Sequence, residues 1–186
     1  MIPNENSDKV ILDLCGGTGA WSEPYRDNGY DVRIITLPDY DVRLLENLNK
    51  LIYGILAAPP CTDLAGSGAR WWKEKGQDAL LGALAIADAC MRVILISKPV
   101  FWSLESPVGR LSKFYGKPRM YFNPCDYGDG YTKKTCLWGD FNEPKKNPVE
   151  PVGKNPIHYM PPSPDRQLLR SITPPGFAKQ FYEANK

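Results

Sequence analysis

This 186-residue chain contains one histidine, His158, and its five cysteines form no Cys-x-x-Cys pair. Structural zinc sites are built from closely spaced cysteines and histidines, so the sequence excludes an ordinary site of that kind. The odd number and irregular spacing of the cysteines also argue against a disulfide framework. We therefore expect reduced thiols and no metal site.

Long apolar runs and a secretory leader are missing as well. The longest apolar stretches, such as VILI at 93–96, are far too short to span a bilayer. The first residues, MIPNENSDK, lack a basic region followed by an apolar one. These absences predict a cytoplasmic protein that has no membrane partner.

Excess charge of one sign is also lacking, because 23 basic residues stand against 21 acidic ones. The net charge of +2 excludes a polybasic tail. Residues 110–154 alone hold nine Lys or Arg and five Asp or Glu, which suits either a basic binding face or a solvated surface. The length and the 42% hydrophobic content fit one globular domain with a sizeable core.

What the chain does contain is an alternation of short apolar strands and helical stretches. We expect strands in 9–14, 30–36, 51–58 and 100–105, a closing hairpin from 119–124 and 134–141, and helices over 21–29, 42–50, 77–97 and 176–185. This order predicts an α/β fold, with a mostly parallel sheet, helices on both faces and an antiparallel hairpin. Nine of the eighteen prolines lie within 139–175, where we expect irregular loop.

The first strand ends in a glycine turn, DLCGGTGA, at residues 13–20. Its glycines, at 16, 17 and 19, do not match the nicotinamide fingerprint G-x-G-x-x-G. They are closer to D-x-G-x-G-x-G, common in enzymes that use S-adenosylmethionine, with Cys15 at the first glycine position. A plain strand-to-helix turn is the alternative. An acid for ribose hydroxyls is expected near Leu37, where Asp39 or Asp41 would serve.

The stretch AAPPCTDLAGSGARWW (57–72) places Cys61 directly after the third strand, at the same sheet edge as the glycine turn. Glu105 ends the fourth strand at that edge. A thiolate that adds to C6 of cytosine makes C5 nucleophilic, provided that N3 is hydrogen-bonded or protonated. A neutral Glu105 would supply that contact. The glycine-rich loop after Cys61 is expected to be flexible and to close over the base.

With these residues the chain resembles the DNA (cytosine-5) methyltransferase family, most of all its short phage-encoded members that lack a large target-recognition domain. DLCGGTGA is similar to the motif D-x-F-x-G-x-G-G, PPC to the Pro-Cys motif, and ESP to the Glu-Asn-Val/Pro motif. YGDGYTKKTCLWGDF (127–141) resembles the Gln-x-Arg-x-Arg motif, and SITPPGFAKQFYEAN (171–185) resembles the last motif. The five blocks occur in the family order.

The resemblance implies a Rossmann-like methyltransferase fold that uses S-adenosylmethionine to methylate C5 of cytosine in DNA, inside a prokaryotic or phage-infected cell. It divides a single domain into a catalytic core (1–140), a proline-rich minimal recognition or connector segment (141–170) and a helix that completes the cofactor pocket (171–186). The catalytic residues that it implies are Cys61, Glu105, Lys133 and Lys134. The cofactor-binding residues that we expect are Asp13, Leu14, Gly16, Gly17, Thr18, Gly19, Trp21, Leu37, Asp41, Val42, Pro60 and Thr173.

The chain departs from the family pattern at several positions. Thr62 stands where the family has glutamine after the Pro-Cys pair, Ser106 replaces asparagine, and Lys133 and Lys134 replace arginines. Lysine cannot reproduce a bidentate guanidinium contact. The 141–170 segment is too short for an independent reading domain, so we expect relaxed or very short sequence preference, with single-stranded DNA as a favoured substrate. The short segment also leaves room for a protein partner that supplies recognition.

Three other functions stay open. The stretch AAPPC is reminiscent of the D/N-P-P-Y motif of exocyclic amine methyltransferases, although Ala58 and Cys61 lack the amide and the ring which that chemistry requires. A nucleic-acid-binding protein of the same fold with reduced catalysis is the second. Methylation of RNA or a free nucleotide is the third.

Overall fold

The computed structural model describes residues 5–46, 50–152 and 160–186, and its framework is a six-stranded sheet in the order β2-β1-β3-β4-β6-β5. The strands are β1 (Val10–Leu14), β2 (Asp31–Ile35), β3 (Ile52–Ala57), β4 (Phe101–Pro107), β5 (Met120–Phe122) and β6 (Thr135–Asp140). The first four strands pair in parallel, and β6 runs antiparallel between β4 and β5. The expected mixed α/β sheet with a closing hairpin is confirmed.

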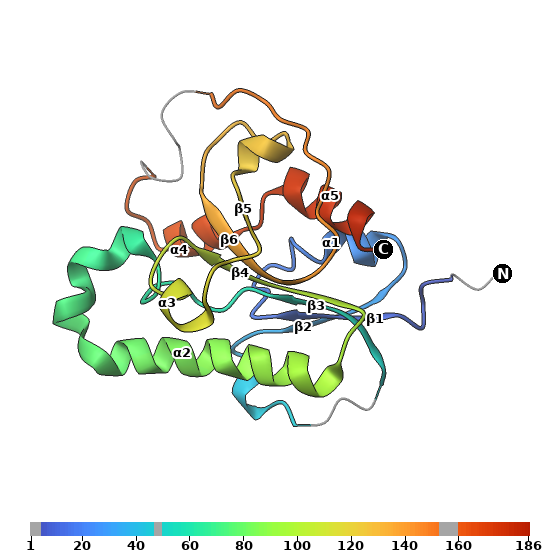
Figure 1. The fold of residues 1–186 in the computed structure, drawn as a ribbon, viewed down its shortest axis with the longest axis horizontal. Helices are drawn as coiled ribbons and strands as arrows, with labels where there is room; N and C mark the ends of the chain where they lie inside the picture. The colour runs from blue at the N-terminus through green and yellow to red at the C-terminus, as the bar shows by residue number, and fades with distance from the viewer. Residues whose placement is uncertain (1–4, 47–49, 153–159) are drawn as a thin grey trace.

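Helices cover both faces of this sheet (Figure 1). The α-helices are α1 (Glu23–Asp27), α2 (Trp72–Ser97), α3 (Ser112–Tyr115), α4 (Arg166–Ser171) and α5 (Pro175–Ala184), and the 3₁₀ helices are η1 (Val42–Leu44), η2 (Gly66–Trp71) and η3 (Pro124–Tyr127). The long helix α2 lies on one face, and α1 and α5 lie on the other (Figure 1). Each face therefore has its own hydrophobic core.

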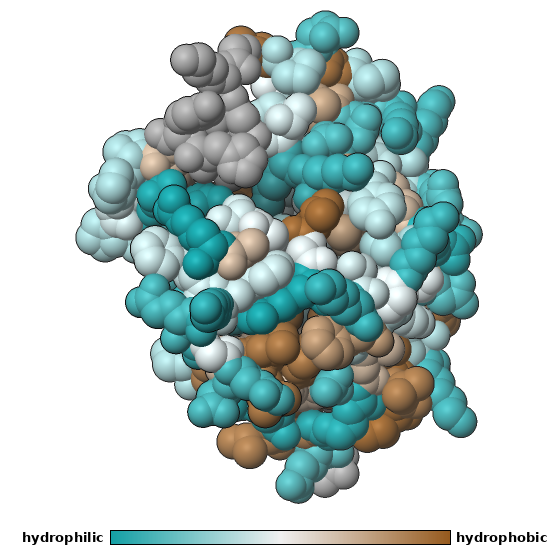
Figure 2. All heavy atoms as spheres, turned by 60° about the vertical axis from the view of Figure 1, so that its left-hand side comes forward, coloured by the Kyte–Doolittle hydropathy of each residue, from teal (hydrophilic) through white to brown (hydrophobic). Residues whose placement is uncertain are grey.

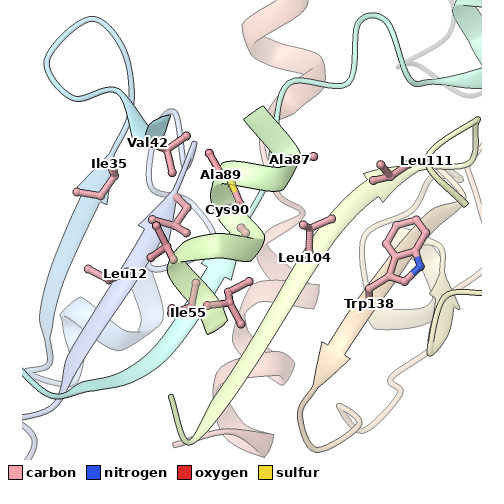
Figure 3. Packing of buried hydrophobic residues seen from close by; sticks show 14 of the residues in the cluster. Leu12, Ile35, Val42, Ile55, Ala87, Ala89, Cys90, Leu104, Leu111 and Trp138 are labelled. Carbon is pink, nitrogen blue, oxygen red and sulfur yellow. The ribbon is translucent and has the colours of Figure 1, made fainter. Parts of the chain in front are cut away.

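The first core lies between α2 and the central strands. Small side chains on α2, among them Ala87 and Cys90, let the helix approach Leu12, Ile55 and Leu104 of the sheet (Figure 3). Each fully buried aliphatic side chain of this kind stabilises the fold by about 1.5–3 kcal/mol. All of β1 and all of β3 except Tyr53 are buried, which explains why these two strands are nearly continuous apolar runs.

Helix α2 has a break near its start, because Gly76 adopts φ 74° and ψ −169°. The continuous helix therefore covers 77–97, as the sequence predicts. Within the described residues, the segment Gly66–Ser97 is long and apolar enough to cross a membrane by length and composition alone. Only 28% of its apolar stretch is buried. Its inner side packs on the sheet, and its outer side adds to the hydrophobic surface in the lower part of Figure 2.

The second core is built largely from aromatic rings. Trp21 packs against Phe177 and Phe181 of α5, with ring centroids 6.0 and 5.4 Å away. Tyr25 of α1 stacks on Phe101 of β4 at 5.9 Å. Trp21, a predicted cofactor-binding residue, is only 2% exposed, and its ring packs between the glycine turn and α5.

Three expected segments differ in the structure. The predicted helix over 42–50 is only the 3₁₀ turn η1, with 47–49 outside the described residues. Arg92 of α2 explains the difference, because its guanidinium binds the carbonyl oxygens of Val42, Arg43 and Leu45, which a continuing helix would need for its own amides.

The glycine-rich loop after Cys61 is the second difference, because 66–71 forms the 3₁₀ helix η2. The third lies in the proline-rich region, where α4 forms over RQLLRS. These six residues lie between Pro164 and Pro174 and include neither proline nor glycine, so a short helix is permitted there. Residues 153–159, with Lys154 and His158, lie outside the described part of the chain.

Candidate active site

The carboxyl ends of β1, β3 and β4 meet at one edge of the sheet. Leu14, Ala57 and Leu104 are direct neighbours in the register. The chain leaves β1 for β2 on one side and returns to β3 on the other, which makes this edge a topological switch point. Ligands of open α/β sheets bind at such points, so the switch point is the place to look for a functional site.

The glycine turn after β1 projects from this edge. A Cβ on Gly16 would lie 2.3 Å from the Asp13 carboxyl, so only glycine fits there. Gly17 has φ +55°, and a Cβ on it would meet nothing within 4 Å. Thr18 is exposed beside it, whereas Gly19 is buried against Ile34. The backbone at 17–18 is therefore open to a ligand.

Asp13 anchors this turn from beneath. Its Oδ2 accepts a 2.6 Å hydrogen bond from the Ser22 hydroxyl, and its Oδ1 has no partner among the described residues. The carboxyl is completely buried, and this burial raises its pKa from 3.8 to about 6 despite the Ser22 bond and the charge of Arg26. A buried acceptor with free capacity suits a ligand that carries hydrogen-bond donors.

The raised pKa of Asp13 makes stability depend on pH. Between pH 4 and pH 6 the folded state holds a proton that the unfolded state has released, so stability falls as pH rises through this window. A rise of this pKa from 3.8 to about 6 corresponds to a loss of about 3 kcal/mol in the free energy of unfolding across the window. Asp13→Asn should flatten the pH dependence of the unfolding free energy over that window, measured by urea titration. Parallel profiles for the two proteins would contradict this.

The other expected cofactor residues are spread around the turn. Asp41 lies near it, because its charge acts on the Cys15 thiol. Its carboxylate already accepts from the backbone N–H and the guanidinium of Arg43, and these contacts hold its pKa below the usual value. Leu14 is buried at the end of β1, Leu37 is exposed, Val42 belongs to the α2 core, Pro60 is exposed beside Cys61, and Thr173 is partly buried between α4 and α5.

Gly17→Leu tests whether the open backbone binds the cofactor. The leucine would occupy the empty space in front of the turn, so calorimetry should show at least about a tenfold loss of S-adenosylmethionine affinity. Gly116→Leu is the matched control, because Gly116 has φ +76° and equally open surroundings after α3, away from the turn. Unchanged affinity in Gly17→Leu would place the cofactor elsewhere.

Cys61 begins a turn that is tied to the segment after β4. Its carbonyl oxygen accepts from the amides of Leu64 and Ala65 at 3.0 and 2.8 Å. Arg110 donates from its backbone to the Leu64 carbonyl at 2.9 Å and from its Nε to the Asp63 carbonyl at 2.7 Å. A Cβ on Gly109 would lie 2.0 Å from the Leu64 oxygen, so this contact requires glycine. The nucleophile candidate therefore sits on a fixed turn.

Burial and three charged groups shift the pKa of the Cys61 thiol. Burial raises its pKa most, the Glu105 carboxyl raises it further, and the charges of Lys133 and Arg170 lower it. Burial also raises the pKa of Glu105, against the charge of Lys133. The site thus brings a thiol, a carboxyl that favours its neutral form, and two cations together at the edge of the sheet.

The two lysines are not equivalent. Lys133 donates to the carbonyl oxygen of Arg170 at 2.9 Å and faces Cys61 and Glu105. Lys134 lies over the Tyr121 ring at 5.0 Å and is not among the groups that act on either of them. Adjacent residues of an extended chain point to opposite sides, which explains the split. The structure brings Lys133 to the site and leaves Lys134 outside it.

The contribution of α4 to the candidate site was not predicted from the sequence. Gln167 donates from Nε2 to the Thr62 hydroxyl at 3.3 Å, next to the nucleophile candidate, and Arg170 of the same helix acts on the thiol. The signal that was available is the run RQLLRS, free of proline and glycine within a proline-rich region. Its helical composition does not say where the helix docks, so only the structure shows that it reaches Cys61.

Of three comparisons with known proteins, one finds a match, and it concerns the fold. No protein-family model matches the chain, and the search of curated proteins gives no match. Among solved structures, the fold is similar to a "putative DNA modification methyltransferase" encoded within an E. coli prophage, with a TM-score of 0.52 and 16% identity. The match covers 83% of this chain and 56% of that one, so the chain spans little more than half of that protein. At this identity the likeness concerns the fold.

Proposed function

We propose that this protein is an S-adenosylmethionine-dependent methyltransferase that methylates C5 of cytosine in DNA. The observation that carries the proposal is the convergence of Cys61 and Glu105 at neighbouring strand ends, beside an open glycine turn at the switch point of the sheet. The fold similarity to a protein described as a DNA modification methyltransferase supports the same reaction class. DNA is the substrate that the proposal implies, with duplex and single strands both to be tested.

Cys61 would act as the nucleophile. Its thiolate adds to C6 of the cytosine and forms an S–C6 bond, while an electron pair moves through the ring toward N3. The bound cofactor would supply an electrophilic methyl group to the C5 carbon made nucleophilic in this way. Loss of the C5 proton to water and cleavage of the S–C6 bond, whose electron pair returns to sulfur, would then restore the thiolate. The demethylated cofactor would leave as the second product, so the enzyme is unchanged after each cycle.

Glu105 would stabilise the charge that develops at N3. A carboxyl whose pKa is raised by burial favours its neutral form and donates a hydrogen bond to a ring nitrogen. The neutral form also spares the neighbouring thiolate a negative charge, since ionised Glu105 disfavours the Cys61 thiolate. The neutral form of Glu105 thus favours both the Cys61 thiolate and the hydrogen bond to N3 of the cytosine.

The cofactor would be held by the turn after β1. The open backbone at Gly17 and Thr18 would allow the cofactor to approach closely. Beneath the turn, Oδ1 of Asp13 is a buried acceptor that has no partner among the described residues. Asp41 is the acid closest to the expected ribose position, although Arg43 already engages its carboxylate. We propose that Leu37, Pro60 and Thr173 line the rim of this cofactor pocket.

Cations and aromatic rings near the mouth of the site fit a nucleic acid. Arg70 lies over the exposed ring of Trp71 at 5.0 Å, and Arg110 over Trp72 at 4.5 Å. The middle of this side of the molecule mixes hydrophilic residues with residues of intermediate hydropathy and a few hydrophobic ones (Figure 2). Rings stack on bases and cations contact phosphates, so this rim suits DNA with little sequence reading.

A methyl-transfer assay with labelled S-adenosylmethionine tests the proposal against duplex DNA, single-stranded DNA, RNA and dCMP. We expect label in DNA, recovered as 5-methylcytosine by chromatography and mass. Label recovered as an N-methylated base would favour amine chemistry, and label in RNA or dCMP alone would change the substrate. No incorporation, with retained DNA binding, would favour the binding protein with reduced catalysis.

A further inference from the structure

Two exposed aromatic rings near the candidate active site each carry a cation. Arg70 lies over the Trp71 ring of η2 at 5.0 Å, and Lys134 lies over the Tyr121 ring of β5, also at 5.0 Å. We call them the η2 pair and the β5 pair. Trp71 is 48% exposed and Tyr121 is 42% exposed, and both cations are exposed as well. A cation covers one face of a ring, so each ring keeps accessible surface for a ligand.

The η2 pair is fixed beside the turn that carries Cys61. Asp63 lies two residues after Cys61, and its carbonyl oxygen accepts from Arg110 Nε at 2.7 Å. The same guanidinium lies over the Trp72 ring at 4.5 Å. Because Trp72 directly follows Trp71, these contacts hold the exposed ring close to the nucleophile candidate.

The β5 pair is joined to the same region through the exit of β4. Tyr121 pairs in register with Cys136 of β6, and Lys134 directly precedes β6. The amide of Val108, the residue after β4, donates to the Lys134 carbonyl at 3.5 Å. The Val108 carbonyl accepts from the amide of Gly66, the first residue of η2, at 2.8 Å. One residue thus connects the segments that carry the two pairs.

We propose that the η2 pair and the β5 pair together bind a single strand of DNA that passes over the candidate active site. In the sheet order β3-β4-β6-β5, β4 lies between β3 and the β5–β6 hairpin. Cys61 follows β3, and Glu105 lies near the end of β4. A strand that runs from one pair to the other therefore crosses both candidate catalytic residues.

The chemistry of the two pairs suits unpaired bases. An aromatic ring binds a base by stacking on its face, and a cation beside the ring binds the adjoining phosphate. In a duplex, neighbouring base pairs cover both faces of each base, so the rings have no free face to stack on. An unpaired strand also presents its cytosines without the cost of flipping them out of a helix. The inference rests on the proposed function for the fate of the cytosine, whereas the binding itself needs no cofactor.

Fluorescence anisotropy of a labelled, cytosine-containing oligonucleotide of about 12 residues tests the inference with the full-length protein in the absence of cofactor. We expect the single strand to bind at least about tenfold more tightly than the same oligonucleotide annealed to its complement. Trp71→Ala and Tyr121→Ala should each weaken single-strand binding about tenfold. Arg70→Gln and Lys134→Gln should each lower the slope of log affinity against log salt concentration by about 0.7, because each removes one phosphate contact.

Phe114→Ala is the matched control for the loss of an exposed ring. Phe114 is 51% exposed, but it belongs to α3, which the hydrogen bond from Tyr115 to Asp88 ties to α2 at 2.7 Å. Its single-strand affinity should equal that of the wild type. Trp71→Phe should keep most of the affinity, since it keeps a ring.

Duplex binding as tight as single-strand binding would overturn the inference, as would unchanged affinity in either alanine variant or an equal loss in Phe114→Ala. Binding of single-stranded RNA but not of DNA would overturn it too. Methyl transfer to DNA by a protein without a single-strand preference would refute the inference and leave the proposed function intact. Single-strand binding that depends on both rings, without methyl transfer, would do the reverse.

Discussion

Cys61→Ser is expected to abolish methyl transfer, with turnover reduced by roughly a thousandfold or more. A serine hydroxyl has almost the same size as the thiol but remains protonated at neutral pH, so it cannot add to C6. The variant should fold as the wild type does, because Cys61 is only partly buried and its backbone carbonyl, not its side chain, organises the turn to Leu64 and Ala65. The measurement is the initial rate of label transfer to cytosine-containing DNA.

Trapping the covalent intermediate gives the same prediction a second readout. DNA with 5-fluorocytosine should form an adduct that survives denaturation in the presence of cofactor, because fluorine cannot leave C5 as the proton does. The adduct should be missing in Cys61→Ser. Cys125→Ser is the matched control. Cys125 is also partly exposed, but it lies on η3 and is not among the groups that shift the pKa of Glu105. Full activity of Cys61→Ser would refute the proposal that Cys61 is the nucleophile.

The order of the elements and the sheet edge that carries the candidate site were predictable from the sequence. The buried strands are apolar runs that stop at glycine or proline, and a strand-helix alternation of this kind has few arrangements in three dimensions. Cys61 and Glu105 therefore reach the same edge as the glycine turn, as the sequence indicates. Parallel pairing guarantees their proximity without any knowledge of side-chain packing.

The parts that could not be predicted depend on contacts between distant segments. The stretch 42–50 has a helical pattern, yet Arg92, far along the chain, takes the carbonyl oxygens of its first residues. Likewise, Trp21 follows the glycine turn in sequence, but Phe177 and Phe181 of α5 draw it into a core. Local propensity is a weak prior, and tertiary contacts override it at 42–50. The burial of Trp21 likewise depends on a segment more than 150 residues away.

The mouth of the site illustrates the same limit. Lys133 and Lys134 are adjacent lysines, so the sequence does not show which of them faces the candidate site. In the structure Lys134 lies over the Tyr121 ring, whereas Lys133 binds the Arg170 carbonyl. The docking of α4 is equally hidden, because a six-residue helix has no periodicity that could reveal its partner. Each of these contacts joins residues more than ten positions apart in the chain.

Glu105→Gln is expected to lower kcat by roughly a hundredfold or more, while the affinity for S-adenosylmethionine stays close to that of the wild type. Glutamine retains the shape and offers an amide N–H, but it cannot give a proton to N3 as charge moves into the ring. The glycine turn that would hold the cofactor belongs to β1, two strands away from β4, so its contacts are unaffected.

The pH profile separates this role from a structural one. Burial raises the pKa of Glu105, and the proposed mechanism uses its neutral form. Wild-type kcat should therefore fall as pH rises through that pKa, and Glu105→Gln should lose this descending limb. Ser106→Ala is the matched control, since Ser106 is the next residue of β4, points to the opposite face of the sheet, and has a buried hydroxyl without a partner among the described residues. Its kcat and its pH profile should match the wild type. A Glu105→Gln effect confined to KM would assign Glu105 to binding alone, because a contact made only in the transition state must appear in kcat.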